Sequence, residues 1–206
     1  MNESTEVKIL NIITLVHKET NSYLIQTDSG WLMVDAGWPD TFAQLLQILN
    51  QNNITINEVN YLVVTHFHPD HAGLVQNLKD LGTTLLLHPY QVPYINKLNL
   101  LFKKNSKANF KDITANNNMV LKENESREFL HSIGIEGEII STPGHSDDSV
   151  SLVLDNYCAF IGDLPSITLL EAYNDMVLDD SWEVIKKYKV KTIYPGHGDA
   201  YEMPSS

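Results

Sequence analysis

The stretch Thr65–Leu74, THFHPDHAGL, places three histidines and an aspartate within six residues. The whole chain of 206 residues holds only 8 histidines. The apolar run before the stretch, Asn60–Thr65, is rich in β-branched residues and predicts a buried strand. A single histidine after a strand is usually a capping or core residue. Imidazole nitrogens and carboxylates also bind metals, so the remaining strand ends of the chain must decide between these interpretations.

Three more potential ligands follow predicted strands. His145 lies in STPGHSDDS, Asp163 ends YCAFIGD, and His197 lies in YPGHGD, each with a neighbouring glycine that permits a tight turn. In layered α/β folds, strand ends gather at one edge, and ligands bind there. Five of the eight histidines therefore predict one metal centre rather than unrelated structural roles. The other three, His17, His88 and His131, are assigned to packing or the surface, with a place near the site as the alternative for His88.

The pattern outside these motifs alternates strands with helices. In the first half it predicts a hairpin, a helix opened by a capping box of Thr41 and Gln44, and a helix ended by Gly82. The corresponding ranges are strands Ile9–Val16, Ser22–Thr27, Gly30–Gly37 and Thr83–His88, and helices from Thr41 and over Leu74–Leu81. In the last third it predicts strands Gly137–Thr142, Val150–Asp155, Tyr157–Asp163 and Val190–Tyr194, and a helix Asp180–Lys189 capped by Asp180 and Glu183. Length and pattern predict a single α/β domain over residues 1–206.

Residues 96 to about 135 show little periodicity. We predict a variable surface or lid segment there, partly helical near Leu98–Phe102. Five of the 14 basic residues gather in it: Lys97, Lys103, Lys104, Lys107 and Lys111. They form either a solvated face or part of a lid over an acidic substrate.

Composition restricts the partners. The net charge of −12 disfavours nucleic acid and anionic membranes, and no apolar run is long enough to span a bilayer. The single cysteine, Cys158, excludes an intrachain disulfide and is compatible with a reducing compartment. We expect a cytoplasmic protein that acts on a small molecule, and the sequence leaves the oligomeric state open.

The motifs NSYLIQTDSGWLMVDAG, VVTHFHPDHAGL, STPGHSDDS, FIGD and YPGHG, in this order, resemble the metallo-β-lactamase superfamily, in its glyoxalase II-like branch. The resemblance implies a four-layered αβ/βα sandwich with a dinuclear metal centre at one edge. It assigns His66, His68 and His145 to one metal and Asp70, His71 and His197 to the other, with Asp163 bridging them. It also implies that Asp35 braces a loop or a ligand histidine, against the simpler interpretation of a turn aspartate.

The resemblance implies a hydrolase in which a metal-bridging hydroxide attacks an ester, thioester or lactone. Asp70 would orient the nucleophile or pass on its proton. The cofactors would be two divalent ions, with zinc favoured and iron or manganese as alternatives. Antibiotic hydrolysis is disfavoured, because one group of β-lactamases carries a cysteine at the position of Asp163 and another lacks a carboxylate there. An iron-dependent persulfide dioxygenase, a homoserine-lactone lactonase and a non-enzymatic binding protein stay open.

Overall fold

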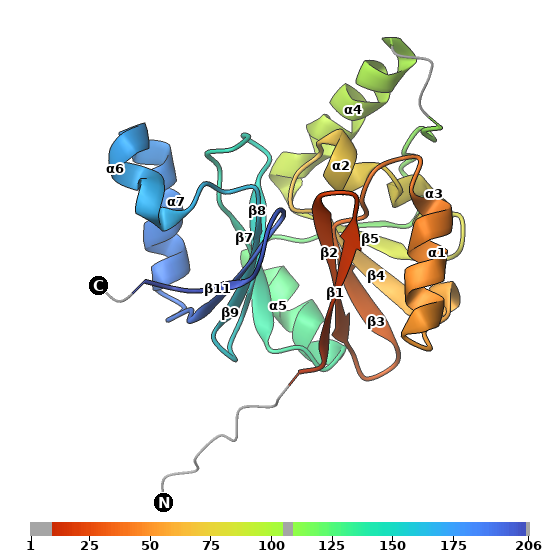
Figure 1. The fold of residues 1–206 in the computed structure, drawn as a ribbon, viewed down its shortest axis with the longest axis horizontal. Helices are drawn as coiled ribbons and strands as arrows, with labels where there is room; N and C mark the ends of the chain where they lie inside the picture. The colour runs from red at the N-terminus through yellow and green to blue at the C-terminus, as the bar shows by residue number, and fades with distance from the viewer. Residues whose placement is uncertain (1–9, 105–108, 205–206) are drawn as a thin grey trace, which may run out of the picture.

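Two β-sheets face each other in the computed structural model, which describes residues 10–104 and 109–204 (Figure 1). The first sheet has the order β1-β2-β3-β4-β5-β6 and the second β11-β10-β9-β8-β7. The first contains β1 Ile12–His17, β2 Thr20–Gln26, β3 Trp31–Val34, β4 Val59–Val63, β5 Thr84–Leu87 and β6 Asn118–Val120. The second contains β7 Gly137–Ser141, β8 Val150–Leu154, β9 Cys158–Gly162, β10 Thr192–Pro195 and β11 Tyr201–Glu202. The predicted hairpin is confirmed, since β2 and β3 pair antiparallel.

Helices cover the outer face of each sheet. The first sheet carries α1 Phe42–Gln51, α2 Pro69–Ala72, α3 Val75–Lys79 and α4 Val92–Lys104, and the second carries α6 Leu170–Tyr173 and α7 Met176–Lys186. A further helix, α5 Glu123–Ser132, packs beside β7 and against the core between the sheets. Short 3₁₀ turns are η1 Ile56–Glu58, η2 Pro89–Gln91 and η3 Ile167–Leu169. The arrangement is the predicted αβ/βα sandwich.

The alternation of side chains along the strands builds these layers. On β2, Tyr23 and Ile25 point into the core between the sheets, whereas Leu24 packs beneath the outer helices. Because side chains alternate and both faces are covered, β2 is buried along almost its whole length. Among the described residues, none of the helices has the length and apolar character to cross a membrane.

Both predicted capping boxes are wrong. Thr41 precedes α1 but donates its hydroxyl to the Trp38 carbonyl at 2.7 Å instead of capping the helix. Helix α7 begins at Met176, so Asp180 lies inside it, and the true cap is Asp175, which accepts from the Val177 amide at 2.9 Å. A polar residue with an acid or amide three residues later also occurs inside helices, so the pattern alone does not locate the end of a helix.

The segment 96–135 contains more regular structure than its pattern predicts. Helix α4 starts before the segment and runs through the predicted helical part, while β6 pairs with β5 and α5 buries Leu130. Long-range contacts order β6: the buried Lys79 on α3 donates to the Thr114 carbonyl at 2.6 Å and to the Asn118 side chain. A three-residue strand held by such contacts is too short to show a periodic pattern. Lys107 lies outside the described residues.

Candidate metal centre

All seven predicted ligand residues meet at one edge of the two sheets. The first sheet supplies His66, His68, Asp70 and His71 from the turn after β4 and from α2, and the second supplies His145, Asp163 and His197 from three separate loops. They form two groups, in each of which the candidate ligand atoms lie within 4.8 Å of one another. One group is His66, His68 and His145, and the other is Asp70, His71, Asp163 and His197.

Asp163 belongs to the second group and also lies close to the first. Its Oδ1 is 3.2 Å from His71 Nε2 and 3.4 Å from His197 Nε2, both in the second group. Its Oδ2 is 3.6 Å from His145 Nε2 and 3.9 Å from His66 Nε2, both in the first group. One carboxylate therefore presents a different oxygen to each group, which is the geometry that a bridging ligand requires.

Hydrogen bonds orient the histidine rings. The Nδ1–H of His71 donates to Asp35 Oδ2 at 2.8 Å, and that of His197 donates to the Glu19 carbonyl at 2.6 Å. Because Nδ1 of each ring is occupied by this hydrogen bond, Nε2 is the ring atom that faces the other candidate ligands. His68 is turned the other way, with its Nδ1 3.0 Å from His145 Nε2.

Asp35 connects Thr65, at the start of the turn after β4, with His71 in α2. Its buried carboxylate accepts from the Thr65 amide at 2.7 Å and from the Thr65 hydroxyl at 2.8 Å, in addition to His71. The residue has φ 59°, a conformation that Asp and Asn adopt more readily than most residues. Its carboxylate contacts both the residue preceding His66 and the ring of His71, which is the bracing position that the resemblance implies.

Three polar residues that the sequence analysis did not single out hold the loops together. The buried Asp148 accepts from the Phe67 amide at 2.7 Å and so ties the His145 loop to the first-sheet turn. Asn21 donates to the carbonyls of Pro195 and Gly198, on either side of His197. Gln91 donates to the Val64 carbonyl at 2.8 Å. Asp148 stands in the quoted SDDS cluster, which is a usable signal, but nothing local distinguishes Asn21 or Gln91.

Gly196 leaves room for the centre. A Cβ at this position would lie 2.4 Å from Asp163 Oδ1 and 2.6 Å from His71 Cε1. Either distance is shorter than side-chain carbons tolerate, so any larger residue would push into the second group. The PGHG motif is therefore explained by the space around His71 and Asp163 as well as by its turn.

Burial and neighbouring charges shift the pKa values of the candidate ligands in opposite directions. Burial, aided by the surrounding imidazoles, holds the pKa of His66 well below its usual value. Burial also disfavours a charge on His71, but the carboxylate of Asp35 and its neighbours outweigh it and raise the pKa of His71 well above its usual value. Burial tends to raise the pKa of Asp70, but the ring of His71, whose Nε2 lies 3.3 Å from Asp70 Oδ2, outweighs burial and lowers the pKa to about 2. Asp70 is therefore ionised at neutral pH.

The donor set fits divalent metal ions. Within the described part of the chain, three buried atoms of the centre, His66 Nε2, His71 Nε2 and Asp163 Oδ1, have no hydrogen-bond partner. Buried polar atoms without partners are rare unless an ion or a water satisfies them. Nitrogen and carboxylate ligands suit zinc, and also iron or manganese.

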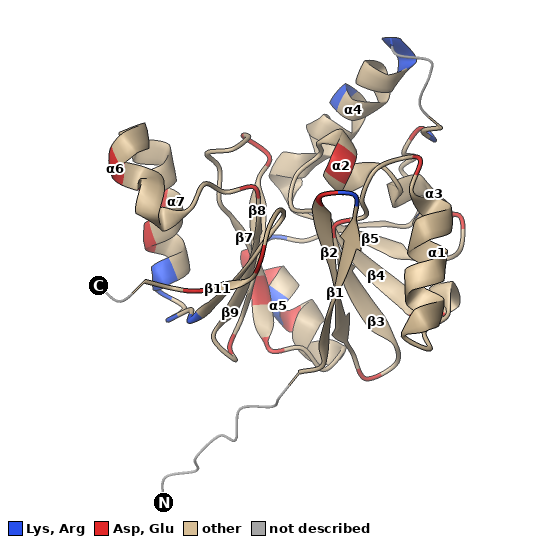
Figure 2. Cartoon of the chain, in the orientation of Figure 1, with Lys and Arg blue, Asp and Glu red and all other residues tan. Residues whose placement is uncertain are grey.

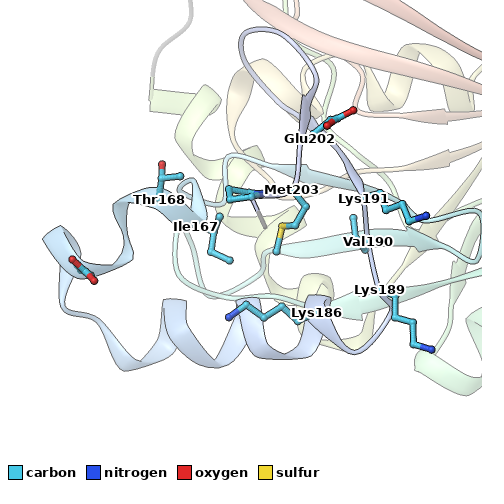
Figure 3. A pocket seen from close by; sticks show the side chains of 10 residues that line it. Ile167, Thr168, Lys186, Lys189, Val190, Lys191, Glu202 and Met203 are labelled. Carbon is cyan, nitrogen blue, oxygen red and sulfur yellow. The ribbon is translucent and has the colours of Figure 1, made fainter. Parts of the chain in front are cut away.

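Two cavities open on the centre, and His197 lines both. One, of about 420 Å³, is lined by Asp163, His145 and the chain that follows β9, and the other, of about 560 Å³, is lined by Lys18, Thr20 and Trp38. A further cavity, of about 850 Å³, lies between α7, η3 and β11 and is lined by lysines, two glutamates and apolar side chains (Figure 3). It contains none of the seven candidate ligands, so size alone does not locate the site.

The remaining histidines lie outside both groups. His17 is completely buried at the end of β1, His88 is buried with Nε2 3.2 Å from Glu123 Oε1, and His131 is exposed beside Glu136. The prediction of packing or surface roles agrees with these positions.

The chain is an αβ/βα sandwich with two groups of residues at one sheet edge that could hold metal ions. The sequence model of the metallo-beta-lactamase superfamily matches residues 17–197, and the chain belongs to this superfamily, most of whose members are hydrolytic metalloenzymes. It is 28% identical over 192 residues to a Beta-lactamase-like protein 2 homolog of Caenorhabditis elegans, covering 87% of this chain and 56% of that protein. It is 25% identical to a protein of Methanocaldococcus jannaschii named "Probable metallo-hydrolase MJ0888", covering 87% of this chain and 88% of the other.

Solved structures agree in fold. A metallo-beta-lactamase family protein from Thermus thermophilus, TTHA1429, superposes with a TM-score of 0.70 at 19% identity and covers 94% of this chain and 74% of its own. TTHA1623, solved in a di-iron-bound form, superposes with a TM-score of 0.66 at 21% identity and covers 92% and 93%. At these identities the likeness supports the fold and leaves the substrate undetermined.

Proposed function

We propose that this protein is a dinuclear metal-dependent hydrolase that acts on an ester, thioester or lactone. The observation that carries the proposal is the position of Asp163, whose two oxygens face the two ligand groups. Membership of a mostly hydrolytic superfamily supports it. The acidic chain, with its charge of −12, favours a small substrate over a nucleic acid. A cytoplasmic location remains part of this proposal.

The cofactors we propose are two divalent ions, with zinc favoured and iron as the alternative that the di-iron form of TTHA1623 suggests. His66, His68 and His145 would hold one ion, Asp70, His71 and His197 the other, and Asp163 would be shared. When bound, such ions supply Lewis acidity for the carbonyl and lower the pKa of water toward neutrality.

Asp70 would act on the attacking water in the reaction. Water adds to the carbonyl carbon, the acyl–oxygen or acyl–sulfur bond breaks, and the leaving group takes up a proton. Asp70 Oδ2 lies 3.2 Å from His197 Nε2 and accepts from the Thr20 hydroxyl at 3.4 Å. Because its pKa is lowered to about 2, this carboxylate is an acceptor that can orient water and hold its proton during transfer.

The candidate ligands differ in burial, as expected for a catalytic site that a substrate must reach. His66 and His71 are buried at the base, while His68, His145 and His197 are exposed at the mouth, where a substrate carbonyl can approach. Structural metal sites are usually closed, whereas catalytic sites keep an open position.

A substrate screen tests the proposal. Purified protein, with its metal content measured first, is assayed against thioesters, lactones, phosphodiesters and β-lactams. We expect hydrolysis of a thioester, ester or lactone, and a loss of at least about a hundredfold in His68→Ala. His131→Ala is the matched control, since His131 is exposed beside Glu136 and lies outside both ligand groups. Equal activity in wild type and His68→Ala would overturn the site. One iron per chain with oxygen consumption would support the iron-dependent oxygenase instead.

A further inference from the structure

The cavity beside Asp163 has an apolar wall that the fold alone does not require. Leu169 in η3 and Tyr173 in α6 line it, although they are 47% and 55% exposed. Large apolar side chains that are exposed together beside a polar centre often mark a binding surface. Both residues follow β9 within eleven residues of its last position, so the chain that positions Asp163 also builds this wall.

The base of the wall is fixed by α7. Leu164, next to Asp163, is buried and also lines the cavity. The following residue, Pro165, accepts at its carbonyl from Trp182 Nε1 at 2.9 Å, and Trp182 is completely buried in α7. Ser181 of the same helix donates to the Pro143 carbonyl at 2.6 Å, two residues before His145, which also lines the cavity. The cavity is therefore largely formed before a ligand enters, which lowers the entropic cost of binding.

Charge restricts what the cavity accepts. Its acidic members are Asp163 and Asp199, and among the described residues that line it there is neither lysine nor arginine. Since Asp163 would be bound to the metal ions, a carboxylate at the far end of the acyl group would face Asp199 without a cationic side chain to pair with. Figure 2 shows the basic residues elsewhere, at the end of α4, at the turn between β1 and β2 and at the far end of α7. The wall therefore favours a neutral, apolar group.

The other cavity on the centre differs in character. It is lined by Lys18, which pairs with Asp40 at 2.9 Å and lies 5.6 Å from the ring centre of Trp38. His197 lines both cavities, so a substrate bound across the centre can place one end in each. Polar groups of a leaving alcohol or thiol suit the Lys18 side, and the apolar end suits the Leu169 side.

We infer that the cavity formed by Leu164, Leu169 and Tyr173 binds the acyl group of the substrate, and that the protein prefers esters or thioesters of uncharged, apolar carboxylic acids of medium length. This inference rests on the proposed hydrolytic function and makes Leu169 and Tyr173 specificity-determining residues. A volume of about 420 Å³ is that of a site for part of a small molecule rather than for a polymer.

A chain-length series tests the inference. Thioesters of N-acetylcysteamine with acetyl, butyryl, hexanoyl and octanoyl groups are compared by kcat/KM, with succinyl as the charged counterpart of butyryl. We expect kcat/KM to rise about threefold to fourfold per added methylene until the cavity is full, which is the effect of burying about 0.8 kcal/mol per methylene. Succinyl should be at least about tenfold poorer than butyryl, because its carboxylate would enter an apolar cavity in which Asp199 is the nearby charge and no cationic side chain can pair with it.

Substitutions in the cavity test which residues cause the chain-length dependence of kcat/KM. Leu169→Ser and Tyr173→Ser should flatten the chain-length dependence of kcat/KM, because they should lower kcat/KM far more for the octanoyl thioester than for the acetyl thioester. Met176→Ser is the matched control, since Met176 is 80% exposed nearby but does not line the cavity. The same series of uncleavable thioethers, measured by calorimetry with metal-loaded protein, gives a readout that does not require turnover.

The outcomes separate the two proposals. Hydrolysis with no dependence on chain length, or with the same dependence in Tyr173→Ser and wild type, would overturn the inference and leave the hydrolase standing. Chain-length-dependent binding of the thioethers with no hydrolysis of any thioester, ester or lactone would overturn the proposed function and retain the acyl site. A preference for succinyl over butyryl would contradict the assignment of an uncharged acyl group.

Discussion

The two sheets contribute to the metal centre in different ways. The first sheet delivers four candidate ligands from one short turn, and buried side chains hold that turn from behind: Asp35 contacts Thr65 and His71, and Gln91 holds the Val64 carbonyl. The second sheet delivers three ligands from three separate loops. Two of these, His145 and His197, are exposed, and backbone carbonyls and helix α7 fix their surroundings.

This difference suggests a division of labour. The buried side sets the positions of the ligand atoms, and the open side admits the substrate and surrounds its acyl group. Substitutions behind the first sheet should therefore affect metal affinity first, and substitutions around the second should affect substrate selection first. Asp163 belongs to both tasks, because it touches both groups and lines the cavity.

The largest effect is expected from Asp163→Asn. An amide nitrogen cannot replace the second carboxylate oxygen, so one of the two groups loses its shared ligand. We expect metal content to fall by about half or more and hydrolysis by at least about a hundredfold. Elemental analysis and kcat/KM are the measurements, with Asp179→Asn on the exposed side of α7 as control. Full metal content and full activity in Asp163→Asn would exclude a shared carboxylate.

Asp35→Asn tests the buried side. Asn tolerates the φ of 59° at this position, so the fold should persist, but the carboxylate that orients His71 is lost. We expect metal affinity to fall about 10-fold to 100-fold, as is usual when such a partner is removed. Competition with a chromophoric chelator measures the affinity. If Asp35→Asn changed the preference among acyl chains and left metal affinity unaltered, the proposed division between the two sides would be wrong.

His17 makes the buried side sensitive to acid. The residue is buried beside Gly37, and burial lowers its pKa to about 4. Since this value is below the unfolded value of 6.5, the unfolded chain binds the proton more readily, and stability is lost as the pH falls from about 6.5 toward 4. We expect wild type to lose about 2 kcal/mol more than His17→Phe between pH 7 and pH 5. Urea unfolding at both pH values measures the difference, and parallel losses in the two proteins would contradict it.

The smallest effect is expected from the lysines of segment 96–135. Lys103 pairs with Asp112, Lys111 pairs with Asp80, and Lys97 lies over the Tyr94 ring. The lid over an acidic substrate stays a prediction: replacing Lys103 and Lys104 by alanine should raise KM for anionic substrates and leave neutral ones unchanged. A change of less than about twofold for both classes is what a solvated face gives.

The candidate ligands could be predicted because their signal is local. Ligand type and the position after a strand are visible in the sequence around His66, His145 and His197, and a neighbouring glycine is visible beside His145 and His197. The sandwich followed from the strand and helix pattern with the family resemblance. These features require no knowledge of how distant segments meet.

The supporting residues could not be predicted because their roles arise from long-range contacts. Asn21 reaches the loop around His197 across the two sheets, and β6 is ordered by Lys79 from α3. The start of α7 was misplaced for a related reason: Asp175 and Asp180 both precede an apolar turn, and only the left-handed Asn174 before Asp175 marks the break. The apolar wall formed by Leu169 in η3 and Tyr173 in α6 had no periodic pattern in the sequence.

Metal titration counts the ions that the two ligand groups bind. Metal-free protein is titrated with zinc by calorimetry, and the bound metal is then counted by elemental analysis, for wild type and for His68→Ala. We expect about two ions per chain in wild type and about one in His68→Ala, because that histidine belongs to only one group. A single ion in wild type, or an unchanged count in His68→Ala, would contradict it.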